Sequence, residues 1–258
     1  MTKFQWITLG NGKENLILIH GWGFNSTIWN ILLPKLKINF KIHLVDLPGF
    51  GINNQLKFKN LNNTAKFLEK YIPDDSILLG WSMGGLIVNK IAILYPQKVK
   101  GIINVASSPC FIKKKNWPGI SKKILYKFYY KLNVNYQQTI LDFITLQITN
   151  SKHFNVKMHI LKGLISYQRK PSALTLKKGL KLICSSDLRK EICKIKIPFL
   201  RIYGYLDILV PKEISKILDT HSLKTKSIIM RFSSHAPFIS ETYKFCSIIL
   251  RFVKNLNI

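Results

Sequence analysis

The sequence predicts an α/β protein with a mostly parallel central sheet that is flanked by helices and interrupted by one helical insertion. Two observations indicate this. Short apolar runs alternate with helical stretches in the first half of the chain and again near its end, which is the order of strands and crossover helices in a parallel sheet. From about 111 to 185 the chain is instead aromatic, lysine-rich and helical in pattern. We therefore predict a core of residues 1–110 and 186–258, and a helical cap of residues 111–185.

Six apolar segments are the predicted strands of this core. In chain order they lie in residues 14–21, 41–51, 76–85, 98–109, 196–204 and 227–232. Their apolar residues are nearly continuous, as expected when helices cover both faces of a sheet. A helix should follow the third strand and end at Pro96, and another should close the chain. Ligands bind at the carboxyl ends of parallel strands, so the polar residues that follow each strand are the candidates for function.

The composition argues against several classes of protein. The chain has 258 residues and a mean hydropathy of +0.08. No apolar run approaches the roughly 20 residues of a membrane helix, and the N-terminal MTKFQWITLGNGKEN lacks the apolar region of a secretory signal. The four cysteines are scattered, with no CxxC pair or histidine cluster that would indicate a metal site. We expect a cytoplasmic protein with reduced thiols, no metal and no membrane association.

The net charge of +28 is the most unusual number in the composition. Such a charge first suggests a partner such as nucleic acid or a membrane surface. Lysine far exceeds arginine, however, and asparagine and isoleucine are abundant too, which is typical of coding drift toward A and T. The chain has no zinc finger, no RNA-binding aromatic pattern and no arginine-rich arm. We expect no nucleic-acid partner.

The segment LGWSMGGL, residues 79–86, joins the third predicted strand to a helix. A Gly-x-Ser-x-Gly pattern at such a junction predicts a nucleophilic serine, because the sharp turn presents the hydroxyl at the edge of the sheet. Gly80 and Gly84 fit this turn, where strand and helix backbones come close. We predict Ser82 as the nucleophile and the amide of Met83, at the helix N-terminus, as a donor to a developing oxyanion.

A serine nucleophile needs a base, and the base needs a carboxylate that orients it. His235 directly follows the last predicted strand, and Asp207 directly follows the strand before it. The competing acids, Asp187 and Asp219, lie before that strand and on the helical stretch after it. We predict Asp207 as the orienting acid and His235 as the general base and acid, in the chain order that this architecture requires.

The loop HGWGFN, residues 20–25, follows the first predicted strand and offers a second oxyanion donor. Its glycines let the backbone approach a ligand, and the amide of Trp22 is the expected donor. Asp46, after the second strand, is expected to order its own turn.

These motifs together resemble the α/β-hydrolase superfamily over nearly the whole chain. Several of them are more specific, and are similar to the esterases of biotin biosynthesis that act on a pimeloyl methyl ester bound to acyl carrier protein. The segments that carry this resemblance are HGWGFNSTIW, HLVDLPGFG, LGWSMGGL, VASSPCF, WPGI, SDLR, PFLRIYGYLDILVP and HAPFIS. The resemblance implies a cofactor-free serine esterase, which we expect to be a monomer, with acyl carrier protein as its partner. It also implies substrate contacts at Trp22, Met83 and the cap segment Phe143, Ile144, Thr145, Leu146 and Gln147.

In one respect the cap departs from this family, whose arginines dock the carrier protein. Compared without gaps, the corresponding positions hold Gln138, Asp142, Asn155 and His159. Residues 113–181 nevertheless contain fifteen Lys or Arg and a single acid, and a cationic cap would attract an acidic carrier. We hypothesise that Lys152, Lys157 and Lys162 replace the arginines, with coding drift as the alternative.

Two other functions remain open from the sequence. A general short-chain carboxylesterase or thioesterase would use the same triad. A basic binding protein could also occupy a catalytically idle hydrolase fold, although the intact order of Ser82, Asp207 and His235 argues against it. Chemistry that requires a carboxylate nucleophile is disfavoured, since Ser82 occupies that position.

Overall fold

In the computed structural model, which describes residues 3–149, 154–166, 169–220 and 225–256, a seven-stranded sheet has the order β1-β3-β2-β4-β5-β6-β7. The strands are β1 (Ile7–Leu9), β2 (Glu14–Ile19), β3 (Phe40–Val45), β4 (Ser76–Trp81), β5 (Val99–Val105), β6 (Phe199–Gly204) and β7 (Thr225–Met230). All neighbours pair in parallel except β1, which is antiparallel to β3. The predicted α/β class, with a mostly parallel sheet, is confirmed.

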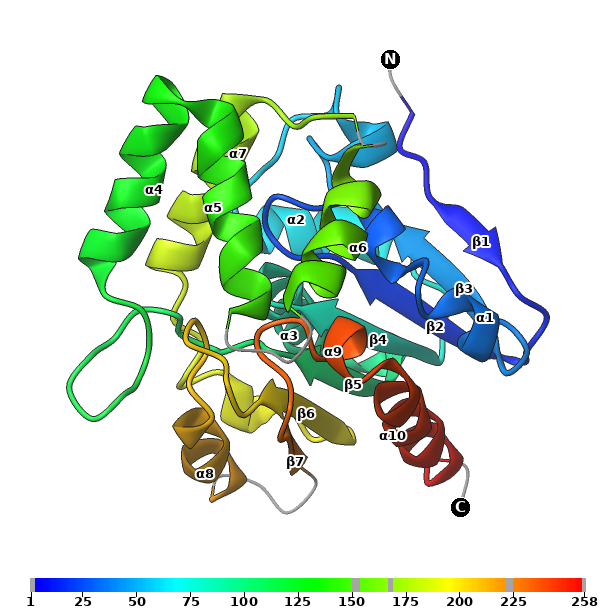
Figure 1. The fold of residues 1–258 in the computed structure, drawn as a ribbon. Helices are drawn as coiled ribbons and strands as arrows, with labels where there is room; N and C mark the ends of the chain where they lie inside the picture. Colours follow the sequence, from blue (N-terminus) through cyan, green and yellow to red (C-terminus); the bar gives the residue numbers. More distant parts are fainter. Residues whose placement is uncertain (1–2, 150–153, 167–168, 221–224, 257–258) are drawn as a thin grey trace.

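Helices lie against this sheet (Figure 1), and some of them form an insertion between two of its strands in the sequence. The helices of the core are α1 (Leu33–Leu36), α2 (Leu61–Glu69), α3 (Met83–Leu94), α8 (Glu213–Asp219), α9 (Pro237–Ser240) and α10 (Thr242–Lys254). Four more follow one another between β5 and β6: α4 (Lys122–Val134), α5 (Tyr136–Ile148), α6 (Phe154–Ser166) and α7 (Ala173–Ser185). These four occupy the segment that we expected to be a cap, and Figure 1 shows α4 at its outer edge.

The burial of the central strands explains their nearly continuous apolar sequences. Every residue of β4 and of β6 is buried. Helix α3 is buried from Met83 to Ala92, and a helix that is apolar all round is expected to pack inside the protein rather than on its surface. The strand that leads to Ser82 and the helix that leaves it are therefore both fixed in the core.

Two further findings concern the composition. All four cysteines are free thiols. Within the described ranges, no helix combines the length and apolar character that crossing a membrane would need.

Candidate active site

Ser82 lies at the turn between β4 and α3, in a backbone conformation that few residues with a side chain adopt. Its φ is 53° and its ψ is −118°, and such a conformation costs about 1–3 kcal/mol. The turn is tight: a Cβ on Gly80 would lie 2.4 Å from the carbonyl oxygen of Gly84, and a Cβ on Gly84 would lie 2.4 Å from that of Ile19. Glycine at both positions is what allows this strained turn to form.

His235 and Asp207 reach Ser82 from the ends of neighbouring strands. His235 follows β7 and its Nε2 lies 2.9 Å from the Ser82 Oγ. Its Nδ1 lies 2.8 Å from Oδ2 of Asp207, which follows β6. All three side chains are buried. The hydroxyl, the imidazole and the carboxylate thus form one hydrogen-bonded chain that is shielded from bulk solvent.

The carboxylate of Asp207 is itself held in place by the backbone. Its Oδ1 accepts hydrogen bonds from the amides of Leu209 (2.8 Å) and Val210 (2.9 Å), which leaves Oδ2 for the histidine. The competing acids are engaged elsewhere. Asp187 pairs with Arg189, and Asp219 pairs with Arg201.

Two backbone amides beside Ser82 donate no hydrogen bond within the described part of the chain. Met83 is the first residue of α3, so the helix offers its amide no acceptor. The amide of Trp22 likewise has no acceptor among the described residues. The loop that carries it abuts the serine, since a Cβ on Gly21 would lie 3.3 Å from the Ser82 Cβ. Two unpaired donors next to a nucleophile are what an oxyanion site requires.

His20 organises this loop, a role that the sequence reasoning missed. Its Nδ1 lies 2.8 Å from the carbonyl oxygen of Gly21, and its Nε2 lies 3.1 Å from the amide of Leu47. Nε2 must accept from that amide, so the ring is neutral with its proton on Nδ1. Burial lowers the pKa of His20, which favours this neutral form. A histidine directly after a strand, at the same sheet edge as Ser82, was the available signal.

Asp46 also does more than order its own turn. Its Oδ1 accepts from the amide of Ser26 at 2.6 Å, and its Oδ2 accepts from the amide of Ile52 at 2.8 Å. It therefore joins the loop after β2 to the loop after β3.

A small cavity of about 20 Å³ lies against Ser82 and His235. It is lined otherwise by apolar side chains of the cap and of the loops around it: Phe111, Ile120, Ile124, Leu125, Phe128, Phe143, Leu180, Ile183 and Leu209. This volume holds about one water molecule. Any acyl chain longer than a few atoms must displace cap side chains to reach the serine.

The five cap residues predicted to contact substrate are in different surroundings. Phe143 lines the cavity at Ser82, whereas Ile144 lines a separate pocket of about 220 Å³. The Thr145 hydroxyl bonds to the carbonyl oxygen of Leu141 in its own helix, and Leu146 is half-buried. Gln147 is fully buried.

Gln147 contacts the residue that follows His235. Its carbonyl oxygen accepts a hydrogen bond from the amide of Ala236, at 3.2 Å. Its side-chain Oε1 is buried and has no partner among the described residues. Helix α5 is thereby attached to the loop that carries His235.

The three lysines predicted to dock a carrier protein are not equivalent. Lys152 lies outside the described residues. Lys157 is buried, with 8% of its surface exposed, and burial lowers the pKa of its ammonium group. Lys162 is exposed on α6. Only Lys162, of the two lysines that can be described, presents its charge to solvent.

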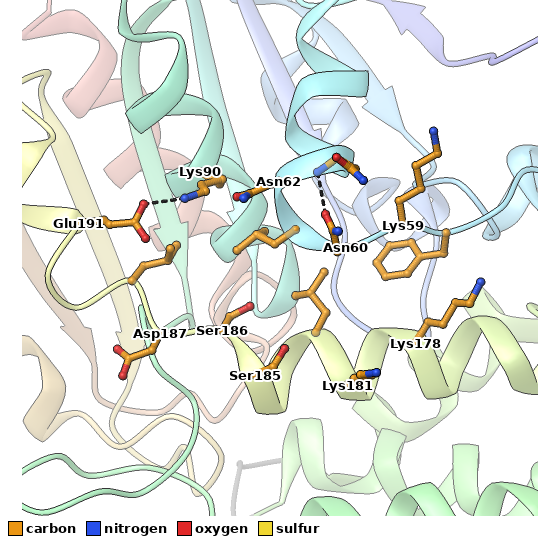
Figure 2. Close-up of a pocket in the computed structure, with 15 residues that line it drawn as sticks. Lys59, Asn60, Asn62, Lys90, Lys178, Lys181, Ser185, Ser186, Asp187 and Glu191 are labelled. Atoms are coloured by element: carbon orange, nitrogen blue, oxygen red, sulfur yellow. Dashed lines mark hydrogen bonds and ion pairs between the residues drawn. The ribbon is translucent and has the colours of Figure 1, made fainter.

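The largest cavity described lies apart from Ser82. It is a groove of about 800 Å³ between the N-terminal end of α2 and one side of α7. Figure 2 shows Lys59, Lys178 and Lys181 around it and an ion pair between Lys90 and Glu191. None of the triad residues lines it, so its size is not a sign of the catalytic site. Among the described residues, no cluster of His, Cys, Asp and Glu could hold a metal ion.

Comparisons with known proteins identify the family and the fold. Residues 14–242 match the family model for the alpha/beta hydrolase fold. A protein of Wigglesworthia glossinidia brevipalpis, named pimeloyl-[acyl-carrier protein] methyl ester esterase, is 44% identical, and the match covers 100% of both chains. A protein of the same name from Yersinia enterocolitica is 37% identical, again over 100% of both chains.

Solved structures of low sequence identity share the fold. An esterase from Exiguobacterium antarcticum superimposes with a TM-score of 0.86 at 19% identity, covering 96% of this chain and 94% of that one. A bromoperoxidase from Bacillus anthracis gives a TM-score of 0.86 at 20% identity, with the same coverage. At such identities the likeness concerns the architecture alone.

Proposed function

Because this chain belongs to the α/β hydrolase family and, within it, to the family of the pimeloyl-[acyl-carrier protein] methyl ester esterases, we propose that it hydrolyses the methyl ester of a pimeloyl group carried on acyl carrier protein. The products are the free carboxylate on the carrier and methanol, in biotin biosynthesis. The observation that carries the chemistry is the hydrogen-bonded chain from Ser82 through His235 to Asp207. The full-length identity to relatives of that name supports the substrate.

The first half of the proposed reaction forms an acyl-enzyme. His235 Nε2 takes the proton of the Ser82 hydroxyl, which attacks the ester carbonyl. The amides of Trp22 and Met83 donate to the oxyanion, and removal of one such donor costs about 3–4 kcal/mol of barrier in comparable enzymes. His235 then protonates the departing methoxide, which leaves as methanol.

The second half regenerates the enzyme. A water molecule gives a proton to the same His235 nitrogen and attacks the acyl-enzyme carbonyl, and the protonated histidine returns the proton to the Ser82 oxygen. Asp207 accepts from Nδ1 throughout, so it fixes the tautomer and stabilises the imidazolium. No metal or cofactor enters any step of this proposal.

The apolar cavity supports the choice of an aliphatic acyl group. Phe128 and Phe143 meet edge to face beside the serine, with ring centroids 5.9 Å apart. Such a lining favours the methylene chain and methyl ester of the substrate over a charged end group. We propose that the distal ester enters first and that the thioester linkage to the carrier stays outside the cavity.

A matched pair of substrates tests the proposal. Wild-type enzyme and Ser82→Ala are compared on the pimeloyl methyl ester of acyl carrier protein and on p-nitrophenyl acetate. We expect wild type to hydrolyse the carrier ester, and Ser82→Ala to lose about 10³-fold or more in kcat. Absence of activity on both esters would favour an idle fold that only binds. Rescue of a biotin-requiring strain by the wild-type gene, but not by Ser82→Ala, is the expected result in cells.

A second candidate function is a general short-chain carboxylesterase or thioesterase. The volume of about 20 Å³ favours it, since a short acyl group needs less movement of the cap. Activity on p-nitrophenyl acetate without activity on the carrier ester would establish this alternative. We also propose that the enzyme is cytoplasmic and that it is a monomer. Light scattering of the purified protein measures its oligomeric state directly.

A further inference from the structure

Helix α4 has an apolar face toward the cap and a cationic, aromatic face toward solvent. Leu125 and Leu132 are buried on its inner side, and Phe128 packs on Phe143 of α5. We define the outer side as the α4 surface: Lys122, Lys123, Tyr126, Lys127 and Tyr130, all of them exposed. Tyr126 and Tyr130 are 54% and 67% exposed. The surface combines positive charge with flat apolar side chains.

This surface adjoins the opening of the catalytic cavity. Ile120, Ile124, Leu125 and Phe128 line the cavity together with Ser82, and Lys127 follows Ile124 by three positions, which makes the two side chains neighbours on the helix surface. Ile124 is nevertheless 47% exposed. A side chain that both lines the cavity and reaches solvent marks the place where the cavity meets the surface. A partner whose substrate enters there must rest on α4.

The charges of the α4 surface are available to a partner. None of Lys122, Lys123 and Lys127 has an ion-pair partner within the described residues. Other cap lysines are engaged: Lys131 pairs with Asp142, and Lys114 pairs with Asp187.

The charged residues of the neighbouring helices are arranged differently. The only charged residue of α5 is Asp142, whose carboxylate binds Lys131 and Gln138. On α6, Lys157 is buried and Lys162 is exposed. Lys178 and Lys181 of α7 line the groove of Figure 2, which lies apart from Ser82. The exposed lysines of α4 are distinguished by sharing a helix with Ile124, which lines the cavity and is 47% exposed.

We propose that the α4 surface is where an acidic acyl carrier protein docks to deliver its ester to Ser82. This inference rests on the proposed function for the identity of the partner. Acyl carrier proteins are acidic, and their prosthetic arm bears a phosphodiester, so lysines around the opening attract both the protein and the arm. Tyr126 and Tyr130 add rigid apolar contact area at the centre of the surface.

An anionic membrane is the other partner that a basic, aromatic helix could suit. The position of α4 favours the carrier. Lys127 is a helix neighbour of Ile124, which lines the catalytic cavity and reaches solvent, so a partner on the α4 surface rests beside the entrance that its own substrate must use. Membrane attachment would not require this adjacency.

Charge reversal on α4, with a matched reversal elsewhere, tests the proposal. The variant is Lys123→Glu/Lys127→Glu, and the control is Lys66→Glu/Lys70→Glu, which has the same spacing at exposed positions of α2 and its C-cap. Steady-state kinetics are measured on the carrier ester and on dimethyl pimelate, a substrate of the same acyl chain without a carrier. Binding of the carrier ester is measured by titration in a Ser82→Ala background, where it is not consumed.

We expect the α4 variant to lose about tenfold or more in kcat/KM and in affinity for the carrier ester at low salt. Its kcat/KM for dimethyl pimelate should equal that of wild type, its salt dependence should be weaker, and the α2 control should behave as wild type. Equal carrier affinity in the α4 variant and the control would overturn the proposal.

Two further outcomes separate the alternatives. If the α4 variant loses binding to phosphatidylglycerol vesicles but keeps its affinity for the carrier, α4 is a membrane face and the proposal is wrong. If the carrier binds through Lys123 and Lys127 but wild type does not hydrolyse its ester, the docking surface stands and the proposed function fails.

Discussion

The indole Nε1 of Trp22 donates a hydrogen bond of 2.8 Å to the carbonyl oxygen of Leu176. The two residues are 154 positions apart in the sequence, one in the loop after β2 and the other in α7 of the cap. The same indole meets Phe143 of α5 edge to face, at a centroid distance of 4.6 Å. Since the amide of Trp22 is a proposed oxyanion donor, one residue couples the position of the cap to the geometry of the catalytic site.

Trp22→Phe should therefore impair catalysis while leaving the backbone amide in place. The loss of the bond to Leu176 frees the loop after β2 to shift, and small displacements of an oxyanion donor are costly. We expect kcat on p-nitrophenyl acetate to fall by about tenfold, together with a loss of about 1–3 kcal/mol in the free energy of unfolding.

Trp29→Phe is the matched control, because Trp29 is equally buried but its Nε1 has no hydrogen-bond partner among the described residues. It should leave kcat unchanged, and its loss of stability should be the smaller of the two, because no hydrogen bond is removed. If both variants lose the same fraction of kcat, the bond between Trp22 and Leu176 has no catalytic role.

Asp207→Asn should leave the fold intact and slow the reaction strongly. The asparagine can still accept from the amides of Leu209 and Val210, but it favours the wrong tautomer of His235 and does not stabilise its charged form. In serine proteases the same change costs about 10⁴-fold in kcat, and we expect a loss of that order on any ester. Asp187→Asn removes a carboxylate that is paired at the surface with Arg189, and its kcat should match that of wild type.

The chain position of each triad residue was enough to predict which side chains would meet. Ser82, Asp207 and His235 each directly follow an apolar strand, and parallel strands bring their carboxyl ends to one edge of the sheet. Asp187 precedes β6 and Asp219 lies on α8. Their places in the chain are therefore enough to exclude both from that edge. Local pattern and topology therefore agree at the site.

Other features depend on contacts that no local pattern encodes. Strand β1 has three residues, which is too short for a period to be recognised, and its place in the sheet depends on pairing with β3. The role of His20 depends on the amide of Leu47, which comes from a different loop. A count of charges on the cap does not distinguish the buried Lys157 from the exposed Lys162, since only the packing of α6 separates them.

The cavity at Ser82 makes a prediction about acyl-chain length. At about 20 Å³ it is too small for a seven-carbon chain, so we expect lining side chains, Phe143 among them, to move when such a chain binds. Phe143→Leu keeps the site apolar and removes part of that barrier. On a series of p-nitrophenyl esters, we expect the ratio of kcat/KM for hexanoate to that for acetate to rise several-fold, because acetate needs little of the space. An unchanged ratio would mean that long chains enter by another route.

The stability of the fold should depend on pH through His43, which lies on β3 opposite Thr8 of β1. Its Nδ1 lies 3.1 Å from the Thr8 hydroxyl and its Nε2 lies 2.9 Å from Oδ1 of Asn15. Burial, and secondarily the charge of Lys41, lowers the pKa of His43 to about 4. In the unfolded chain the pKa is about 6.5. Between these two pH values the unfolded state binds a proton that the folded state does not bind. The free energy of unfolding therefore falls as the pH drops from about 6.5 toward about 4.

Between pH 7.5 and pH 5.0, His43 alone should account for about 2 kcal/mol of the decrease in the free energy of unfolding. His43→Gln removes this contribution, and urea denaturation at the two pH values should therefore give a smaller difference for the variant than for wild type. His20, whose pKa is also lowered by burial, keeps part of the pH dependence in both proteins. His159→Gln, at an exposed position on α6, should retain the full wild-type difference. If His43→Gln retains it as well, the ring is not held neutral in the folded protein.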